Sequence, residues 1–299
     1  MKKTCAIVIP IYNEADVIAE TLKDVRGLVG ALPDWSFEIV CVNDGSADDT
    51  ARVLKAESGI TVLNHHINRG YGAALRTGLD ACRQEWIAIV DADGTYPIPD
   101  LVRMLQSVTD ETHMVVGARR GAGISVSPHK RLARWVLRKM VHALTGVMVP
   151  DLNSGMRVFR RALYLEFAHL LPMGFSFTTT LTVSSLYRGF RIDYTPIDYM
   201  KRKGKSHIRP LQDFVNFTIL IVRLASYFEP LRFFVPLSMI IFALGILRAI
   251  RDVIITNAFG TASEVMLLLS LQVFLTGVIA DVVVRRSQAN TLRIDPSKE

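Results

Sequence analysis

The chain has 299 residues, half of them apolar and 21% charged, and its 35 lysines and arginines against 28 aspartates and glutamates give a net charge of +7. This composition excludes an intrinsically disordered chain, a collagen-like repeat and a small disulfide scaffold, and it is more apolar than that of an ordinary soluble enzyme. The three cysteines lie in or beside apolar runs without a CxxC spacing, which predicts buried thiols in a reducing compartment rather than a zinc site or disulfides.

Short apolar runs separated by helix-forming stretches dominate the first 200 residues. The first run follows two lysines, as in a signal peptide, but it has no small-residue cleavage site and meets Glu14 and Asp16 at once. The alternation of buried strands and helices predicts an α/β domain with a Rossmann-like, mostly parallel sheet. The predicted strands are residues 5–12, 37–42, 60–63, 86–90 and 113–116.

The chain becomes more apolar after residue 208. Residues 214–228 are too few to cross a bilayer and contain Arg223, so they predict a helix along the membrane interface. Residues 233–247 and 265–284 each approach the ~20 residues of a spanning helix, which predicts two transmembrane helices. A buried core hairpin is the alternative, but the preceding ~200 residues are enough to form a core of their own.

Basic residues predict the orientation of this membrane part. They are frequent between residues 201 and 232 and after residue 284, whereas the connecting loop contains only Arg251, with Arg248 at the helix end. The positive-inside rule therefore places both termini and the N-terminal domain in the cytoplasm. A third span at residues 214–228 would put Arg285 and Arg286 outside, against the same rule.

Polar residues follow the first two predicted strands, where ligands bind in doubly wound sheets. Asn13 is expected to cap the next helix, with Asp16 at its third position. After the second strand, Ser46 and Asp49 have the spacing of a capping box. Both expectations describe how the strand ends lead into helices.

Two aspartates follow the fourth predicted strand. Asp91 and Asp93 are two residues apart on a chain that leaves a strand, so both carboxylates can reach one hard cation while Ala92 points away. By itself this pattern is more typical of surface turn chemistry. Its place at a strand end, beside two further motifs at strand ends, favours a metal that bridges the phosphates of a nucleotide.

Five motifs occur in order along the chain: VIPIYNEADVI, VNDGSADDT, NRGYGAAL, DADGTYP and NSGMRVF. Together they closely resemble the family 2 glycosyltransferases with a GT-A fold. With the apolar hairpin, the chain looks most like the polyprenyl-phosphate glycosyltransferases, the group of dolichol-phosphate mannose synthase. The resemblance covers about residues 4–210 strongly and the membrane part in layout only, and it is specific for the fold and reaction class but not for the sugar.

The resemblance implies roles for single residues. Those implied for the base and ribose of a GDP- or UDP-linked sugar are Pro10, Tyr12, Glu14, Val42 and Asp44. Those implied for the diphosphate and its Mg²⁺ or Mn²⁺ are Asp91, Ala92 and Asp93, with Asp91 and Asp93 as metal ligands.

The chain departs from the family pattern at two positions. Asn43 stands where the family often has a first aspartate before Asp44, so the resemblance implies no role for Asn43 in binding. Thr95 stands where many members have a glutamine, two residues after the second metal aspartate. Threonine is a shorter neutral oxygen donor, so a direct third ligand at this position is left open.

The acceptor implied by the resemblance, a lipid phosphate, carries about −1.5 to −2 charges at neutral pH, so its oxygen is already a nucleophile. Holding this anion beside a sugar diphosphate requires arginines. The candidates are Arg119, Arg120, Arg131, Arg134, Arg202, Lys203 and Lys205. The resemblance favours Arg119 and Arg131 at the acceptor phosphate, and Arg202 with Lys205 as a clamp over the diphosphate.

Several of these residues also have alternative interpretations that involve no contact with a substrate. The segment around Arg131 and Arg134 is also a basic amphipathic helix that contacts water or anionic lipid, and the segment of Arg202 and Lys205 also serves as a positive-inside signal. Asp151 is expected to orient the acceptor phosphate or a sugar hydroxyl, or to act only as a cap or turn residue.

Other side chains are expected to have no role in the reaction. Adjacent His65 and His66 point apart, so neither is expected to bind metal. Asp281 is expected to pair with Arg285 along one helix face.

The predicted function is the metal-dependent, inverting transfer of one sugar from a nucleotide donor to a polyprenyl phosphate at the cytoplasmic membrane face. Asp93, Asp151 and Arg119 are its candidate catalytic residues. The expected partners are the nucleotide sugar, the polyprenyl phosphate and the membrane, without nucleic acid, and a homo-oligomer is compatible with the sequence. The expected parts are a cytoplasmic GT-A domain at residues 1–210, an interfacial helix region at 211–230, a transmembrane hairpin at 231–286 and a cytoplasmic tail at 287–299.

Three alternatives are weaker. A processive polysaccharide synthase resembles the same family but has a Gln-x-x-Arg-Trp motif, whereas Arg131 stands at the glutamine position before Arg134-Trp135 here. A non-catalytic membrane scaffold would be expected to have lost the aspartate pair. A sugar-nucleotide pyrophosphorylase would need a glycine-rich N-terminal phosphate loop, which the first motif lacks.

Overall fold

The computed structural model describes residues 2–120, 128–174, 176–198, 219 and 227–291. The chain forms two compact units, Met1–Phe214 and Val215–Glu299, which are treated separately below. Arg202 and Lys205, both singled out in the sequence, lie outside the described residues, as does most of the region at residues 211–230.

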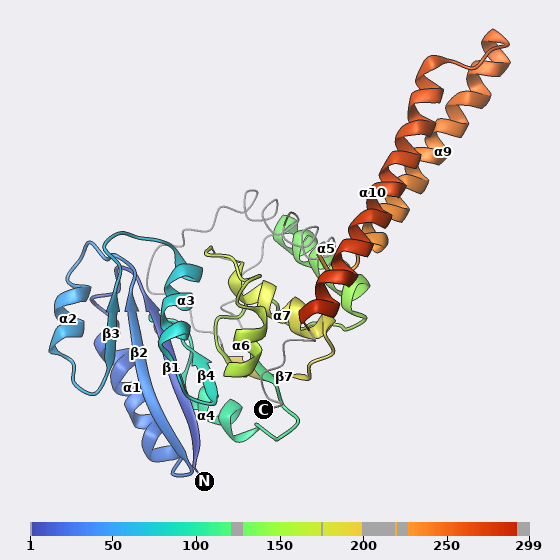
Figure 1. Cartoon of the computed structure of the whole chain (residues 1–299). Helices are drawn as coiled ribbons and strands as arrows, with labels where there is room; N and C mark the ends of the chain where they lie inside the picture. The colour runs from blue at the N-terminus through green and yellow to red at the C-terminus, as the bar shows by residue number, and fades with distance from the viewer. Residues whose placement is uncertain (1, 121–127, 175, 199–218, 220–226, 292–299) are drawn as a thin grey trace. The chain divides into compact units, whose positions relative to one another are not determined.

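The first unit is built on one mixed sheet (Figure 1), in which seven strands in the described part of the chain have the order β3-β2-β1-β4-β6-β5-β7. All neighbours pair in parallel except β6, which runs antiparallel to both β4 and β5. The expected α/β fold with a mostly parallel sheet is therefore confirmed, while β6 and β7 are additions to it. The strands are β1 (Lys3–Ile11), β2 (Trp35–Asn43), β3 (Thr61–Asn64), β4 (Trp86–Ile89), β5 (Met114–Arg120), β6 (Arg157–Arg160) and β7 (Ile192–Asp198).

Helices cover both faces of this sheet, and each face has its own apolar cluster. Along β1, Ile7 and Ile9 point to the cluster shared with α1 and α4, whereas Ala6 and Val8 point to the cluster shared with α3, α6 and α7. This alternation is the two-residue period of a strand buried on both faces. The helices of the unit are α1 (Ile18–Ala31), α2 (Thr50–Ala56), α3 (Tyr71–Ala81), α4 (Ile98–Gln106), α5 (Pro128–Thr145), α6 (Arg161–Phe167) and α7 (Phe177–Tyr187).

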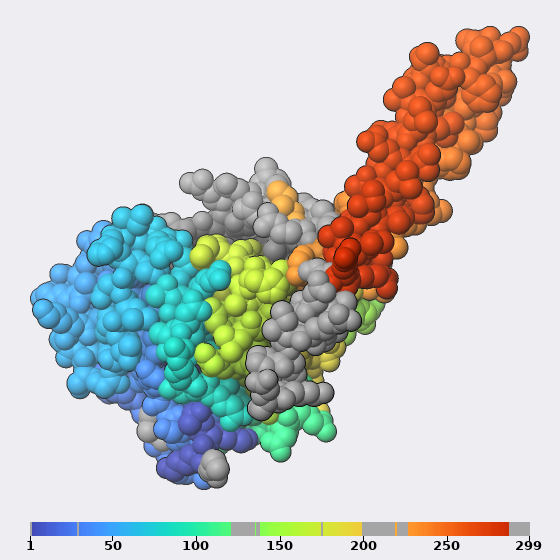
Figure 2. All heavy atoms as spheres, viewed as in Figure 1, coloured from blue at the N-terminus to red at the C-terminus, as the bar shows by residue number. Residues whose placement is uncertain are grey.

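Helices α3 and α6 lie side by side on one face of the unit (Figure 2), where the Tyr164 hydroxyl donates a hydrogen bond to Asp80 Oδ1 at 2.5 Å. The sequence-predicted buried thiols are confirmed, because Cys5, Cys41 and Cys82 are all free and buried. They belong to the packing of the sheet faces.

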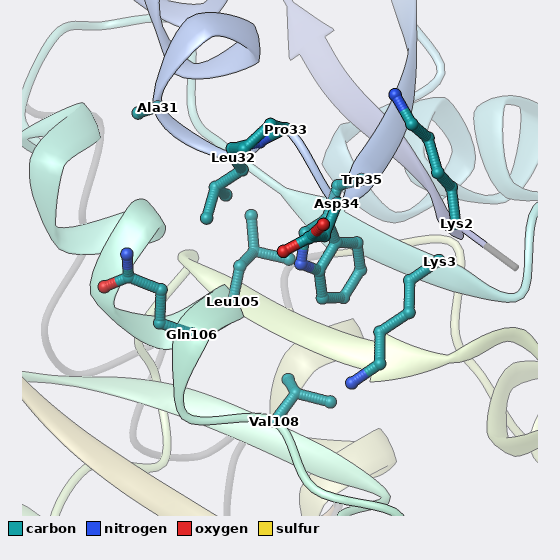
Figure 3. A pocket seen from close by; sticks show the side chains of 10 residues that line it. All are labelled: Lys2, Lys3, Ala31, Leu32, Pro33, Asp34, Trp35, Leu105, Gln106 and Val108. Atoms are coloured by element: carbon teal, nitrogen blue, oxygen red, sulfur yellow. The ribbon is translucent and has the colours of Figure 1, made fainter.

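A cavity of about 720 Å³ opens at the amino-terminal ends of β1 and β2 (Figure 3). Lys3 and Trp35 line it from the strands, Asp34 from the turn before β2, and Leu105 and Gln106 from the end of α4. The Lys3 ammonium lies 5.6 Å from the centre of the Trp35 ring, a cation–π distance. This cavity is at the opposite end of the parallel strands from their carboxyl ends.

The second unit is a helical hairpin of α9 (Pro230–Thr256) and α10 (Thr261–Thr291). Both helices are long and apolar enough to cross a membrane, and most of their apolar side chains are exposed rather than packed inside the protein. The two helices expected at residues 233–247 and 265–284 are therefore present and longer than predicted. A buried core hairpin does not fit this exposure.

Small residues line the contact between α9 and α10. Gly245 lies against Leu267, and Gly277 lies so close to Phe234 that a Cβ at position 277 would be 2.5 Å from the Phe234 Cβ. Ser238, Ser263 and Ser270 are also buried. The spacing of 238 and 245, and of 263, 270 and 277, is a heptad, as in helices that pack at a small crossing angle.

Candidate active site

The carboxyl ends of β1, β2 and β4 meet at one edge of the sheet. β1 pairs with β2 on one side and with β4 on the other, so the chain order reverses around β1. This reversal is the position at which open α/β sheets bind ligands. Because β6 is antiparallel, its first residue lies at the same edge, and the segment before it, residues 151–156, reaches the site.

Asp91 is held between two elements that are distant in sequence. The Tyr71 hydroxyl, at the start of α3, donates a hydrogen bond to Asp91 Oδ1 at 2.9 Å. On the other side, Gly155 lies so close that a Cβ there would be 2.8 Å from the Asp91 Cγ. Burial, and then the charge of Asp91, raises the pKa of Tyr71 well above its usual value, so the phenol remains a donor at neutral pH.

Asp93 is oriented by its own turn. Its Oδ1 accepts hydrogen bonds from the Thr95 backbone N–H at 3.1 Å and from the Thr95 hydroxyl at 2.6 Å. Thr95 is buried, and its hydroxyl proton is directed at Asp93. Thr95, which the sequence leaves open as a direct third ligand, therefore supports Asp93. Between the two aspartates, buried Ala92 accepts a hydrogen bond on its carbonyl from the Thr21 hydroxyl at 3.1 Å.

This donor set fits a divalent cation of the Mg²⁺ or Mn²⁺ type. Carboxylate oxygens are the ligands that such hard cations prefer, and Mg²⁺ at nucleotide sites commonly uses one or two carboxylates plus water and substrate phosphates. No group of three histidine, cysteine or acidic side chains able to hold a metal occurs among the described residues. The two carboxylates match an open site completed by a substrate and not a closed structural site.

Asp44 is enclosed by the turn that leads into α3. Its Oδ1 accepts hydrogen bonds from the Arg69 backbone N–H at 2.9 Å and lies 2.6 Å from His65 Nδ1, and its Oδ2 accepts from the Gly70 backbone N–H at 2.8 Å. The other ring nitrogen of His65 lies 2.9 Å from the Thr77 hydroxyl. His65 therefore orients Asp44, a role that its sequence neighbours do not indicate.

The loops after β1 and β2 bond to each other instead of capping helices. Asn13, at φ 55°, accepts a hydrogen bond from the Ala47 backbone N–H at 2.8 Å, and its own N–H donates to the Ser46 hydroxyl at 3.0 Å. Neither α1 nor α2 has a side-chain cap. The predicted cap at Asn13 and capping box at Ser46 are therefore wrong, because both side chains are used in this contact between loops.

The remaining residues implied for the nucleotide differ in exposure. The Tyr12 side chain is 43% exposed at the edge of the sheet, and Glu14 is half-buried with its N–H donating to the Thr50 hydroxyl at 3.0 Å. Pro10 and Val42 are buried within β1 and β2. Val42 packs in the cluster shared with α3, so it can reach a ligand only through its backbone.

Arg119 and Asp151 form a two-point ion pair at the end of β5. The Nε and Nη2 atoms of Arg119 donate to the two carboxylate oxygens of Asp151 at 2.7 and 2.9 Å. The Asn153 backbone N–H donates to Asp151 Oδ1 at 3.0 Å. Arg131, the second arginine expected at the acceptor phosphate, lies in α5, in a part of that helix whose side chains are outside the description.

The pairing predicts how stability changes in acid. Burial raises the pKa of Asp151, but the hydrogen bonds and charge of Arg119, with the Asn153 N–H, outweigh burial and lower that pKa below its usual value. A carboxylate whose pKa is lower in the folded than in the unfolded state stabilises the fold at pH values above the unfolded pKa of about 3.9. This stabilisation is lost as the pH falls through the folded-state pKa. The melting temperature of the parent in detergent should exceed that of Asp151→Asn at pH 6, and the difference should shrink below pH 4. A difference independent of pH would contradict this account.

Arg157 is the anchor of the segment before β6. Its side chain is fully buried, and its guanidinium donates to the carbonyls of Leu152, Ser154 and Thr178 and to the Thr182 hydroxyl at 2.7 to 3.2 Å. Burial lowers the pKa of Arg157. The guanidinium thus fastens residues 152–154 to α7. The NSGMRVF motif contains this arginine, but a buried anchor has no local sequence signal.

Tyr96 is buried against the segment before β6. Its hydroxyl oxygen accepts a hydrogen bond from the Gly155 backbone N–H at 2.9 Å. Burial raises the pKa of Tyr96, the negative charge of Asp91 raises it further, and the positive charge of Arg119 lowers it. Gly155 also lies against Asp91, and four residues earlier Asp151 pairs with Arg119, so residues 151–155 connect the predicted diphosphate side with the predicted acceptor side.

Two family models match the chain. The model described as Glycosyl transferase family 2 matches residues 6–167, and the model described as GtrB C-terminal hairpin matches residues 229–285. The first covers the β-strands and helices that build the site, and the second covers the apolar hairpin.

Several relatives carry sugar-transferase names. A dolichyl-phosphate hexose transferase from Haloferax volcanii is 30% identical over 69% of this chain and 86% of its own length. A dolichyl-phosphate β-glucosyltransferase from Trichomonas vaginalis is 28% identical over 74% of this chain and 71% of its own. An undecaprenyl-phosphate 4-deoxy-4-formamido-L-arabinose transferase from Pseudomonas fluorescens is 30% identical over 53% of this chain and 47% of its own length.

Solved structures share the fold. Glucosyl-3-phosphoglycerate synthase from Mycobacterium tuberculosis, in complex with Mn²⁺, uridine diphosphate and glucosyl-3-phosphoglycerate, superimposes with a TM-score of 0.55 at 24% identity, over 75% of this chain and 79% of that one. The same protein with Mg²⁺ and uridine diphosphate gives a TM-score of 0.56 over the same shares, also at 24% identity. At this identity the likeness establishes the GT-A-like fold alone.

Proposed function

The chain belongs to glycosyl transferase family 2 and is a glycosyltransferase, and on that premise we propose that it transfers one sugar from a nucleotide diphosphate donor to a polyprenyl phosphate. The relatives named above are transferases to dolichyl or undecaprenyl phosphate, and the hairpin model matches the second unit. The transfer is inverting and depends on Mg²⁺ or Mn²⁺, and it releases a nucleoside diphosphate.

One observation carries this proposal: a single short segment contacts both the aspartate and the arginine of the site. Asp151 pairs with Arg119, and four residues later Gly155 lies against Asp91. An enzyme that joins an anionic lipid phosphate to an anionic sugar diphosphate needs positive charge next to a cation-binding carboxylate group. Residues 151–155 contact both Arg119 and Asp91 and so connect the positive charge with the carboxylate group.

On the donor side, Asp91 and Asp93 hold the divalent cation. When bound, the cation supplies positive charge that offsets the charge developing on the leaving diphosphate. Thr95 and Tyr71 hold the two carboxylates in place through the hydrogen bonds described above. The base and ribose are bound along the ends of β1 and β2, by Tyr12 and Glu14 in the loop, by Asp44 and by the backbone of Pro10 and Val42.

On the acceptor side, Arg119 binds the lipid phosphate, whose oxygen attacks the anomeric carbon in line without a strong general base. Asp151 acts through Arg119 by fixing the plane of its guanidinium, because both carboxylate oxygens are already occupied by donors. Arg131 is a second contact to the acceptor phosphate. Arg202 and Lys205, the expected contacts to the diphosphate, lie outside the described residues.

The same proposal places the enzyme in the membrane. The apolar hairpin of α9 and α10 spans the bilayer twice, and the basic residues that flank it favour a cytoplasmic catalytic domain and cytoplasmic termini. The proposal keeps residues 1–210 as the catalytic domain and residues 231–286 as the hairpin. The interfacial region expected at residues 211–230 and the cytoplasmic tail expected at residues 287–299 lie mostly outside the described residues. The catalytic domain is thereby held where the acceptor head group lies.

The experiment that tests this function is a screen of radiolabelled GDP- and UDP-sugars against polyprenyl phosphate with the full chain in detergent. Label is expected in the organic phase with one donor, together with release of nucleoside diphosphate, and chelation of divalent metal should abolish it. Release of pyrophosphate would overturn the proposal in favour of a pyrophosphorylase. A product that grows by successive sugars would overturn it in favour of a processive synthase.

A further inference from the structure

Tyr71 connects the turn around Asp44 to the aspartate pair. It is the first residue of α3, and its hydroxyl donates to Asp91 Oδ1 at 2.9 Å from an element 20 residues away in sequence. The ring packs against the apolar cluster beneath the sheet. The packing of the ring therefore fixes the position from which the hydroxyl contacts Asp91.

The backbone around Tyr71 is fixed as well. Gly70, at φ 96°, donates its N–H to Asp44 Oδ2 at 2.8 Å, and Ala73 donates its N–H to the Met173 carbonyl at 2.8 Å. Gly72 lies so close to the backbone of residues 172–174 that a Cβ there would clash with it. The first turn of α3 therefore has little freedom to shift, and the position of the hydroxyl follows from it.

Asp91 is confined from the opposite side by backbone. Gly155 leaves no space for a Cβ between itself and the carboxylate, and its N–H is tied to the Tyr96 hydroxyl. A carboxylate with a hydrogen bond on one oxygen and backbone against the other has few alternative rotamers. Such outer contacts set the direction in which a metal-ligating carboxylate presents its lone pairs.

We propose that Tyr71 is a positioning residue for metal binding, holding Asp91 in the orientation in which it ligates the divalent cation. This inference rests on the proposed function, because it takes Asp91 and Asp93 as the cation's ligands. A neutral phenol suits the task, since it orients the carboxylate without cancelling its charge. Loss of an outer-shell partner of this kind typically lowers metal affinity 10- to 100-fold.

The test is a titration of the detergent-solubilised full chain with Mn²⁺, followed by the electron paramagnetic resonance signal of the free ion. Tyr71→Phe keeps the ring and removes only the hydroxyl, and it is expected to weaken Mn²⁺ binding about tenfold. Tyr164→Phe is the matched control, because it removes another hydroxyl that donates to an aspartate, Asp80, at the far end of the same helix. Its Mn²⁺ affinity should stay within twofold of the parent.

A second measurement separates positioning from a general structural effect. In an Asp91→Asn background, Tyr71→Phe should cause no further loss of Mn²⁺ affinity, and the transfer rate of the single Tyr71→Phe variant should recover at saturating Mn²⁺. Parent-like binding by Tyr71→Phe, an additive loss in the double variant, or a rate that does not recover would each overturn the role of Tyr71. If Asp91→Asn itself bound Mn²⁺ like the parent, the proposed metal site would fail, and the inference with it.

Discussion

Replacing Asp93 with asparagine is expected to lower sugar transfer to polyprenyl phosphate by about 1,000-fold, a loss of about 4 kcal/mol of transition-state stabilisation. The variant keeps the size of the side chain, and an amide oxygen can still accept the hydrogen bonds from Thr95. What it removes is the negative charge that holds the cation beside the leaving diphosphate. The measurement is the rate at which radiolabel from the nucleotide sugar enters the organic phase.

Asp49→Asn is the matched control for this substitution. Asp49 pairs with Arg52 at the surface of α2, and its side chain is 66% exposed, so its loss should leave the rate unchanged. If Asp93→Asn transferred sugar at the parental rate while Asp49→Asn did the same, the metal role of Asp93 would be refuted. The binding of Mn²⁺ should fall in parallel with the rate.

Replacing Gly155 with alanine is expected to lower transfer by about 100-fold, the effect of about 3 kcal/mol on the barrier. The new Cβ would lie 2.8 Å from Cγ and 2.9 Å from Oδ1 of Asp91, so the carboxylate must rotate away and give up its hydrogen bond to Tyr71. Asp91 is short and closely surrounded, and it cannot move without leaving the orientation in which it faces a cation. The rate of transfer and the affinity for Mn²⁺ are the two measurements.

Gly27→Ala provides the control for adding a methyl group. Gly27 lies within α1, and a Cβ there meets nothing within 4 Å, so the substitution should preserve the rate and leave stability equal or slightly higher. The thermal midpoint of Gly155→Ala distinguishes local displacement from unfolding. A Gly155→Ala enzyme with the parental rate would show that Asp91 does not need this position for catalysis.

The sequence was most informative where strands are continuous apolar runs. The predicted strand at residues 86–90 corresponds to β4, Trp86–Ile89, because four consecutive buried side chains leave one interpretation. β6 was missed because it has only four residues and begins and ends with arginine, and the first of these, Arg157, is buried by hydrogen bonds rather than by apolar contact. β7 was missed because this half-buried strand contains Pro196. The reversed direction of β6 has no local pattern at all.

For the site, the sequence indicated kinds of residues but not their partners. Asp91 is indicated by its position after a predicted strand, and Asp44 and Arg119 by the family resemblance, whereas their contacts to His65, Tyr71 and Asp151 join segments 20 to 32 residues apart. A histidine beside a second histidine in a loop gives no sign that it will be buried against a carboxylate. These pairings are set by the order of strands in the sheet, which the linear sequence does not display.

In the proposed membrane arrangement, the serine and aspartate near the turn of the apolar hairpin have a consequence for how it sits in lipid. The 27 residues of α9 extend about 40 Å, whereas the hydrocarbon of a bilayer is about 30 Å thick. The Ser263 hydroxyl bonds Asp252 Oδ2 at 2.5 Å, and this polar contact lies about 33 Å along the helix, where it can reach the far head groups. Hydrophobic mismatch is then relieved by tilt and not by vertical sliding, because sliding would draw the carboxylate into the acyl chains. In thinner bilayers the hairpin should lean further from the normal while its turn stays at the same boundary.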